Sequence, residues 1–183
     1  LHRAILLLAS GAPLKALSLL EGPAKEAKRP FPAGEISFDA HGLALAVLLT
    51  RIAAAPTKEH LADFKRAVET RLPDMREIEG QKGVVQPLAP LSRSLISGLE
   101  AVRGGNSIKS LLETTDAASA VTIPPTLSPA WRTALHAAHG YAWSLVARQA
   151  WVLQDFQAVD QAIRAGALAM DSAIAAFLNG PSS

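Results

Sequence analysis

A sustained helical pattern in the last third of the chain constrains the fold most. Ser128-Pro129 is typical of a helix start, because serine caps free backbone N–H groups and proline suits the first helical position. Gln154-Asp155-Phe156 is expected to form a turn, with Asp155 capping a second helix, since one unbroken helix would exceed the usual globular length. Apolar residues then recur at three- and four-residue steps, which predicts one buried face: Leu135, Ala138, Ala142, Leu145, Val152, Phe156, Val159 and Ile163.

Helical signals also dominate the rest of the sequence. Phe38-Asp39 is expected to cap a helix that runs to about Ala55 and is apolar nearly all round, so it should be central. A surface helix should follow, and Gly104-Gly105-Asn106 should separate helices over 91–102 and 107–112. Residues 34–38 hint at a strand without a partner. The stripe expected to bury the surface helix is Leu61, Phe64, Val68 and Leu72.

These patterns predict an all-α protein with six to eight helices, arranged as a multi-helix bundle or a short stack of helical hairpins. A length of 183 residues suits a single helical domain over 1–183. Proline and glycine predict irregular connections near 22–37, 73–90 and 114–128. Helical hairpins over 1–22 and about 138–171 raise the idea of an internal repeat, but the chain between them has no shared period.

Composition limits what the protein can be. Hydrophobic residues make up 49% and aromatic residues 5%, which predicts an alanine-rich core of closely packed helices. Without cysteine there can be no disulfide or thiolate site. No apolar run reaches the roughly 20 residues of a membrane span, so we expect a soluble protein of the cytoplasm or the periplasm. Leu1 is not an initiator methionine, which suggests a processed or partial chain.

The aromatic and histidine side chains after Ser128 are the first candidate site. His136 and His139 lie one turn apart, but a metal site needs a third ligand, so neither a metal nor another cofactor is predicted. The rings could form a binding platform, although filling wide gaps in a core with few aromatics is the favoured interpretation. The candidate pocket or interface comprises Trp131, His136, His139, Tyr141, Trp143 and Trp151.

A basic surface is the second candidate site. The net charge is only +2, so an ordinary solvated surface is favoured over a nucleic-acid footprint, which normally shows clustered Lys and Arg on one face. The candidate residues are Arg29, Lys58, Lys65, Arg66 and Arg71.

No catalytic motif is present. The chain has no Gly-x-Ser-x-Gly turn, and Gly104-Gly105 lacks the flanking strand of a phosphate loop. We therefore expect a non-catalytic helical interaction or scaffold domain that binds another protein or itself. One alternative is a ligand-binding or sensor module with an aromatic-lined pocket between helices. A second is binding to nucleic acid or an anionic surface, and an enzyme is least favoured.

Overall fold

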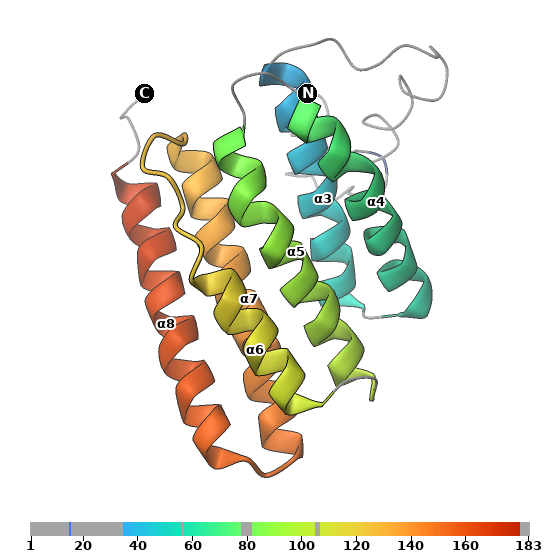
Figure 1. Cartoon of the computed structure of the whole chain (residues 1–183), viewed down its shortest axis with the longest axis vertical. Coiled ribbons are helices and arrows are strands. Elements are labelled where there is room, and N and C mark those ends of the chain that lie inside the picture. Colours follow the sequence, from blue (N-terminus) through green and yellow to red (C-terminus); the bar gives the residue numbers. More distant parts are fainter. Residues whose placement is uncertain (1–14, 16–34, 56, 78–81, 105–106, 180–183) are drawn as a thin grey trace. The chain divides into compact units, whose positions relative to one another are not determined.

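The computed structural model describes residues 15, 35–55, 57–77, 82–104 and 107–179 (Figure 1). Within these ranges the protein is all-α, as predicted, with six helices and no strand. The chain divides into two compact units, residues 1–82 and 83–183. The hairpin predicted over 1–22 and the candidate residue Arg29 lie outside the described residues. The helices are α3 (Glu35–Ala54), α4 (Lys58–Glu77), α5 (Lys82–Val102), α6 (Ile108–Ser119), α7 (Pro129–Val152) and α8 (Phe156–Leu178).

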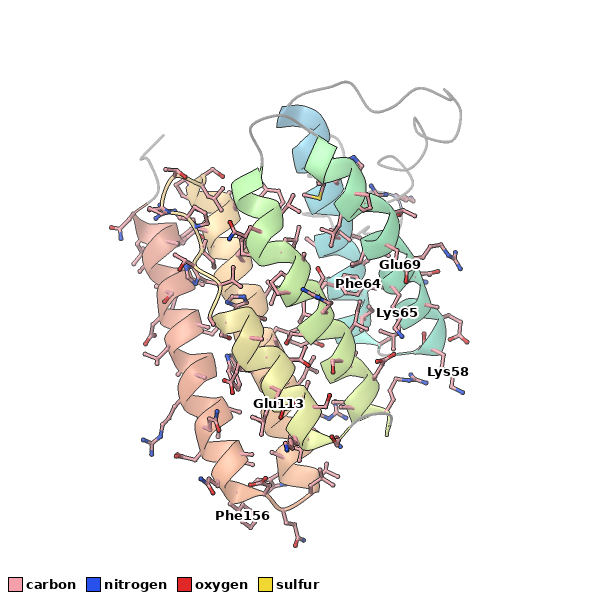
Figure 2. The ribbon with its side chains drawn as sticks, in the orientation of Figure 1. Lys58, Phe64, Lys65, Glu69, Glu113 and Phe156 are labelled. Carbon is pink, nitrogen blue, oxygen red and sulfur yellow. The ribbon has the colours of Figure 1, made fainter. Side chains whose placement is uncertain are left out.

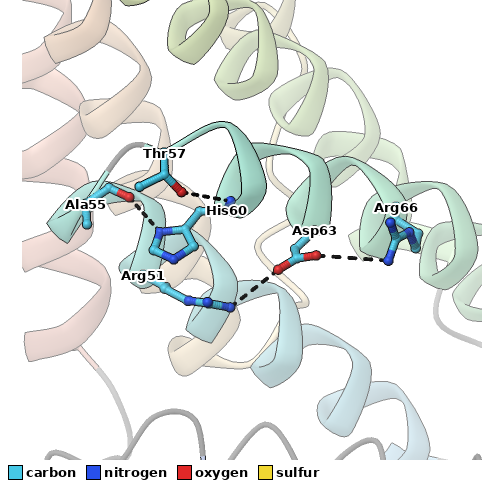
Figure 3. A network of polar contacts seen from close by, with 6 residues as sticks. All are labelled: Arg51, Ala55, Thr57, His60, Asp63 and Arg66. Carbon is cyan, nitrogen blue, oxygen red and sulfur yellow. Dashed lines mark hydrogen bonds and ion pairs between the residues drawn. The ribbon is translucent and has the colours of Figure 1, made fainter.

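In the first unit, α3 and α4 form a helical hairpin. The stripe predicted on α4 is buried in full. A polar network secures the turn between the helices: the Thr57 hydroxyl accepts a hydrogen bond from the His60 backbone N–H at 3.1 Å, and the His60 ring Nδ1 lies 2.6 Å from the Ala55 carbonyl oxygen (Figure 3). Arg51 of α3 also reaches Asp63 of α4, at 3.4 Å. The apolar contact and this network together fix how the two helices pair.

In the second unit, α5 to α8 share one hydrophobic core. Its cluster draws residues from all four helices: Ala101, Leu111, Trp143, Val146 and Ala162. A buried hydrogen bond of 2.9 Å between the Ser94 and Thr115 hydroxyls joins α5 to α6. Because both hydroxyls find a partner, this polar pair avoids the penalty of burial without a hydrogen bond.

Small residues allow α7 and α8 to approach closely. A Cβ at Gly140 would lie 2.7 Å from Met170 Sδ, and one at Gly166 would lie 3.3 Å from Trp143 Cβ. The face of α8 that packs inward is built from small side chains, including Ala158, Ala162, Ala173 and Ala176, all buried. Small residues thus let α7 and α8 approach closely, with Met170 of α8 packed over Gly140 and Trp143 of α7 packed beside Gly166.

The caps predicted at Ser128 and Asp155 are confirmed: they cap α7 and α8, accepting backbone N–H groups from Trp131 and Ala158 respectively. Ser107 caps α6 in the same way, accepting from Ser110. The chain reverses between α7 and α8 within three residues, and Gln154 takes a left-handed conformation there, with φ of 58°.

Removing the Asp155 cap should weaken the start of α8. We expect Asp155→Ala to lower the free energy of unfolding by about 1 kcal/mol, because the Ala158 N–H, now 3.0 Å from the carboxylate, loses its acceptor. Urea denaturation followed by circular dichroism measures this. Gln157→Ala, at an exposed position in the first turn of α8, is the control, and equal effects of the two changes would contradict the assignment.

Three boundaries differ from the sequence-based expectation. Helix α3 begins at Glu35, so Asp39 lies inside it and the predicted cap and the strand hint are both wrong. Helices α4 and α5 extend through Pro73, Pro87 and Pro90, which leaves little of the irregular connection predicted over 73–90. Pro87 is fully buried, as is Leu91. Burial of the α5 face thus outweighs the backbone hydrogen bonds that the prolines cannot make.

None of the helices in the described ranges has the length and apolarity needed to cross a membrane.

Candidate functional site

The candidate aromatic residues do not gather in one pocket. Trp143 is only 3% exposed, and its Nε1 donates a hydrogen bond of 3.0 Å to Ser119 Oγ on α6, so it is a core residue. Trp131 lies in the first turn of α7 and Trp151 in the last. At 1.5 Å per residue, the 20 residues between them correspond to about 30 Å. Trp151, 64% exposed, instead packs edge-on against Phe156, with ring centroids 5.8 Å apart.

The pKa values of His136 and His139, the two histidines of α7, are both lowered. Desolvation by burial, and then the charge of His136, lower the pKa of His139 to about 4. Burial, and then Arg132, lower the pKa of His136. The Nε2 atom of His139 has no hydrogen-bond partner among the described residues. Nor do the described residues bring together three or more His, Asp or Glu side chains that could hold a metal. His139 is therefore a neutral core histidine at pH 7.

Tyr141, the last member of this candidate set, is half-buried. Burial raises the pKa of its hydroxyl, and Arg148 partly opposes that shift. Its phenol is therefore neutral at pH 7 and supplies no charge for catalysis.

The candidate basic residues of α4 are interleaved with carboxylates. Arg66 lies 4.0 Å from Asp63, which also meets Arg51. Lys58 and Lys65 project from the same helix as Glu69 (Figure 2). Arg71 lies partly buried, with its guanidinium 3.3 Å from Nδ1 of His41 on α3. Arg71 thus contacts α3, Arg66 pairs with a carboxylate of its own helix, and cations and carboxylates are mixed along the described part of α4.

Sequence reasoning missed the largest exposed feature of the second unit. Val152 at the end of α7 and Phe156 and Ile163 of α8, all predicted on a buried face, are exposed. Figure 2 labels Phe156 at the end of the α7–α8 hairpin. Residues seven apart lie on one line along a helix, and four large side chains of α8 have this spacing. We call them the α8 stripe: Phe156, Ile163, Met170 and Phe177.

The stripe is continuous with small residues on α7. Ala130, Ala134 and Ala137 line a solvent-open concavity of about 500 Å³, together with Phe177 of the stripe. Ser128, Pro129 and Thr133 complete its wall. Next to it, Met170 lies over Gly140. The α7–α8 hairpin therefore presents a ridge of large apolar side chains beside a shallow, largely apolar hollow.

Comparison with known proteins adds nothing to this picture: no protein-family model, no curated protein and no solved structure matches the chain. The α7–α8 hairpin remains the candidate site on its own geometry. It offers apolar contact area and a shallow hollow, and the described residues bring together no group of three or more His, Asp or Glu that could hold a metal ion.

Proposed function

We propose that the protein is a non-catalytic interaction domain whose α7–α8 hairpin binds an α-helix of a protein partner. The observation that carries this proposal is the reversed distribution of side-chain sizes on α8. Its inner face holds alanines such as Ala162, while Ile163 beside it is 59% exposed and Phe177 is 71% exposed. A helix that needed only to cover its own core would place the large residues inward.

The free energy of burial favours such binding. Fully burying a side chain of the size of Ile, Met or Phe is worth about 1.5–3 kcal/mol. Exposed large apolar residues that form a contiguous patch are characteristic of interaction sites, whereas scattered ones are ordinary. The four residues of the α8 stripe lie in one line, so a single partner surface could cover them together.

The spacing of the stripe indicates the shape of the partner. Apolar residues at every seventh position form one of the two rows through which one α-helix packs along another. The concavity beside Phe177 is lined by small side chains, which permit close approach of a second backbone. A helix lying along the hairpin is the recognition mode that fits both features.

The two alternative functions have less support. A small-ligand pocket needs convergent polar groups around an enclosed apolar space, whereas Trp131 and Trp151 are far apart and the concavity is open. Binding to nucleic acid needs clustered cations, whereas Asp63 offsets Arg51 and Arg66 on the described part of the first unit.

A photoreactive side chain placed on the stripe tests the proposed function. We expect the full chain carrying benzoylphenylalanine in place of Ala167, an exposed residue between Ile163 and Met170, to form a covalent protein adduct in the cells that make it. The same group in place of Gln161, exposed on another side of α8, is the matched control. The adduct should be lost when Ile163→Asp is added.

Absence of an adduct at position 167, or equal yields at 167 and 161, would refute the docking function. An adduct that persists in the Ile163→Asp chain would show that the stripe does not hold the partner. Circular dichroism of each variant checks that the helices remain folded.

A further inference from the structure

We infer that the partner of the α8 stripe is α8 of a second copy of this chain, packed antiparallel against the first. This inference rests on the proposed function, since it names the helix that the α7–α8 hairpin binds. Two properties of α8 carry it: the order of side-chain sizes along the stripe, and the placement of charges beside it.

The order of side chains along the stripe is nearly the same in both directions. Phe156 and Phe177 stand at its ends, Ile163 and Met170 stand inside them, and Ala167 lies close to the centre. An antiparallel pair with its two-fold axis near Ala167 therefore places phenylalanine opposite phenylalanine, and Ile163 opposite Met170. The smallest residue lies where the two helices cross, which allows the closest approach there.

Charges beside the stripe complement each other in the same arrangement. Arg164 follows Ile163 and Asp171 follows Met170, so both lie on one flank of the stripe, and both are exposed. The two-fold axis brings Arg164 of one copy to Asp171 of the other, with an axial offset within about 3 Å from the helical rise. The contact occurs twice in the pair. A parallel pair would instead place this flank of the two copies on opposite sides of the contact, so that Arg164 of one copy would not meet Asp171 of the other.

Asp160 is the polar interruption of the stripe, and it does not oppose the pairing. Its carboxylate is held by Arg164 on the same helix, at 2.9 Å from the guanidinium. This contact draws the charge toward the flank that carries Arg164. A charge network of Asp160, Arg164 and Asp171 of the second copy can then border the apolar contact without burying an unpaired ion.

Single cysteines provide the test, because the chain has none of its own. In the full chain, Ala167→Cys should be linked to itself by a short bifunctional thiol reagent, since the two copies of residue 167 lie near the two-fold axis. Ile174→Cys, on the same face of α8, should not be linked, because its two copies are separated by about 21 Å along the axis. Ala175→Cys, exposed but off the stripe, is the second control.

Sedimentation of the variants supplies an independent measurement. The natural chain should have twice the monomer mass, and Ile163→Asp should have the monomer mass, whereas Gln161→Asp should remain dimeric. Arg164→Asp alone and Asp171→Arg alone should each weaken the dimer, and the double variant should be more dimeric than Arg164→Asp alone, although it sets a second carboxylate one turn from Asp160. Rescue by the double variant depends on the charge pair and is not explained by misfolding of a single variant.

Each other outcome overturns the inference in a recognisable way. Linkage of both Ala167→Cys and Ile174→Cys would mean a parallel pair. An intramolecular adduct between benzoylphenylalanine at position 167 and residues 1–34 would mean that the chain covers its own stripe. A monomer at every concentration, together with a photo-adduct to a different protein at position 167, would refute the second copy and leave the docking function intact. A monomer without any photo-adduct would refute both.

Discussion

Replacing Trp143 with alanine should lower the free energy of unfolding of the α5–α8 unit by about 3–5 kcal/mol. Trp143 is a member of the core cluster that joins all four helices of that unit. Its removal leaves a cavity between them. It also removes the Trp143 Nε1–H group, which donates a hydrogen bond to Ser119 Oγ. Since small domains are stable by only about 5–15 kcal/mol, this single change should remove a large part of the total.

Urea denaturation followed by circular dichroism measures the loss, and Trp151→Ala is the matched control. Both residues are tryptophans of α7, but Trp151 is exposed. At concentrations where the chain is monomeric, we expect Trp151→Ala to lower the unfolding free energy by no more than about 1.5 kcal/mol, because only its edge contact with Phe156 is lost. Trp143→Phe should fall between the two, because it retains most of the ring volume. Similar losses for Trp143→Ala and Trp151→Ala would contradict the core assignment.

Acidification should destabilise the second unit through His139. The pKa of His139 is about 4 in the folded chain and 6.5 when unperturbed. Between these values the unfolded chain binds a proton that folded His139 does not bind, so the unfolding free energy falls as pH falls. The loss begins near pH 6.5 and is complete near pH 4, where it reaches on the order of 3 kcal/mol.

Urea denaturation at a series of pH values tests this contribution. His139→Leu should remove it, so that the variant loses less stability than the natural chain between pH 6.5 and pH 4. His136→Gln should shrink it, because the charge of His136 is the second cause of the lowered pKa of His139. An unchanged pH profile in His139→Leu would show that this residue is not the titrating group.

Local signals in the sequence predicted the starts of α7 and α8 but not that of α3. Ser128 and Asp155 were predictable as caps, because capping depends on one side chain and on backbone atoms a few residues away. The buried stripe of α4 was predictable for a similar reason, since its polar and apolar faces differ clearly. Pro87 was not predictable inside α5, because only tertiary burial compensates for its missing N–H.

The orientation of α8 could not be read from periodicity. Both of its faces are apolar, one made of alanine and the other of large side chains, and a hydrophobic pattern does not say which face packs inward. The orientation of α8 becomes clear from the structure, in which Gly166 of α8 lies close to Gly140 and Trp143 of α7. A signal for the exposed face was nevertheless present in the sequence, namely the spacing of Phe156, Ile163, Met170 and Phe177.

The candidate aromatic site illustrates a different limit. The sequence placed Trp131, Trp143 and Trp151 on one helix, but it could not assign them separate environments. The structure buries the middle residue and leaves Trp151 in solvent. Exposure of a ring depends on neighbours from other helices, such as Ser119 beside Trp143, and no spacing rule within α7 reveals them.

The paired glycines of the hairpin also set its register. A Cβ built on Gly140 would lie 3.5 Å from the carbonyl oxygen of Gly166, and a Cβ built on Gly166 would lie 3.7 Å from the carbonyl oxygen of Gly140. Sliding α8 by one turn would set Ala162 or Met170 where Gly166 lies now, and a side chain would then meet the backbone of α7. Of these alignments, only the observed one therefore avoids a steric clash between the two helices. The residues of the α8 stripe therefore keep fixed positions relative to α7. Any helix that binds the hairpin must match their spacing.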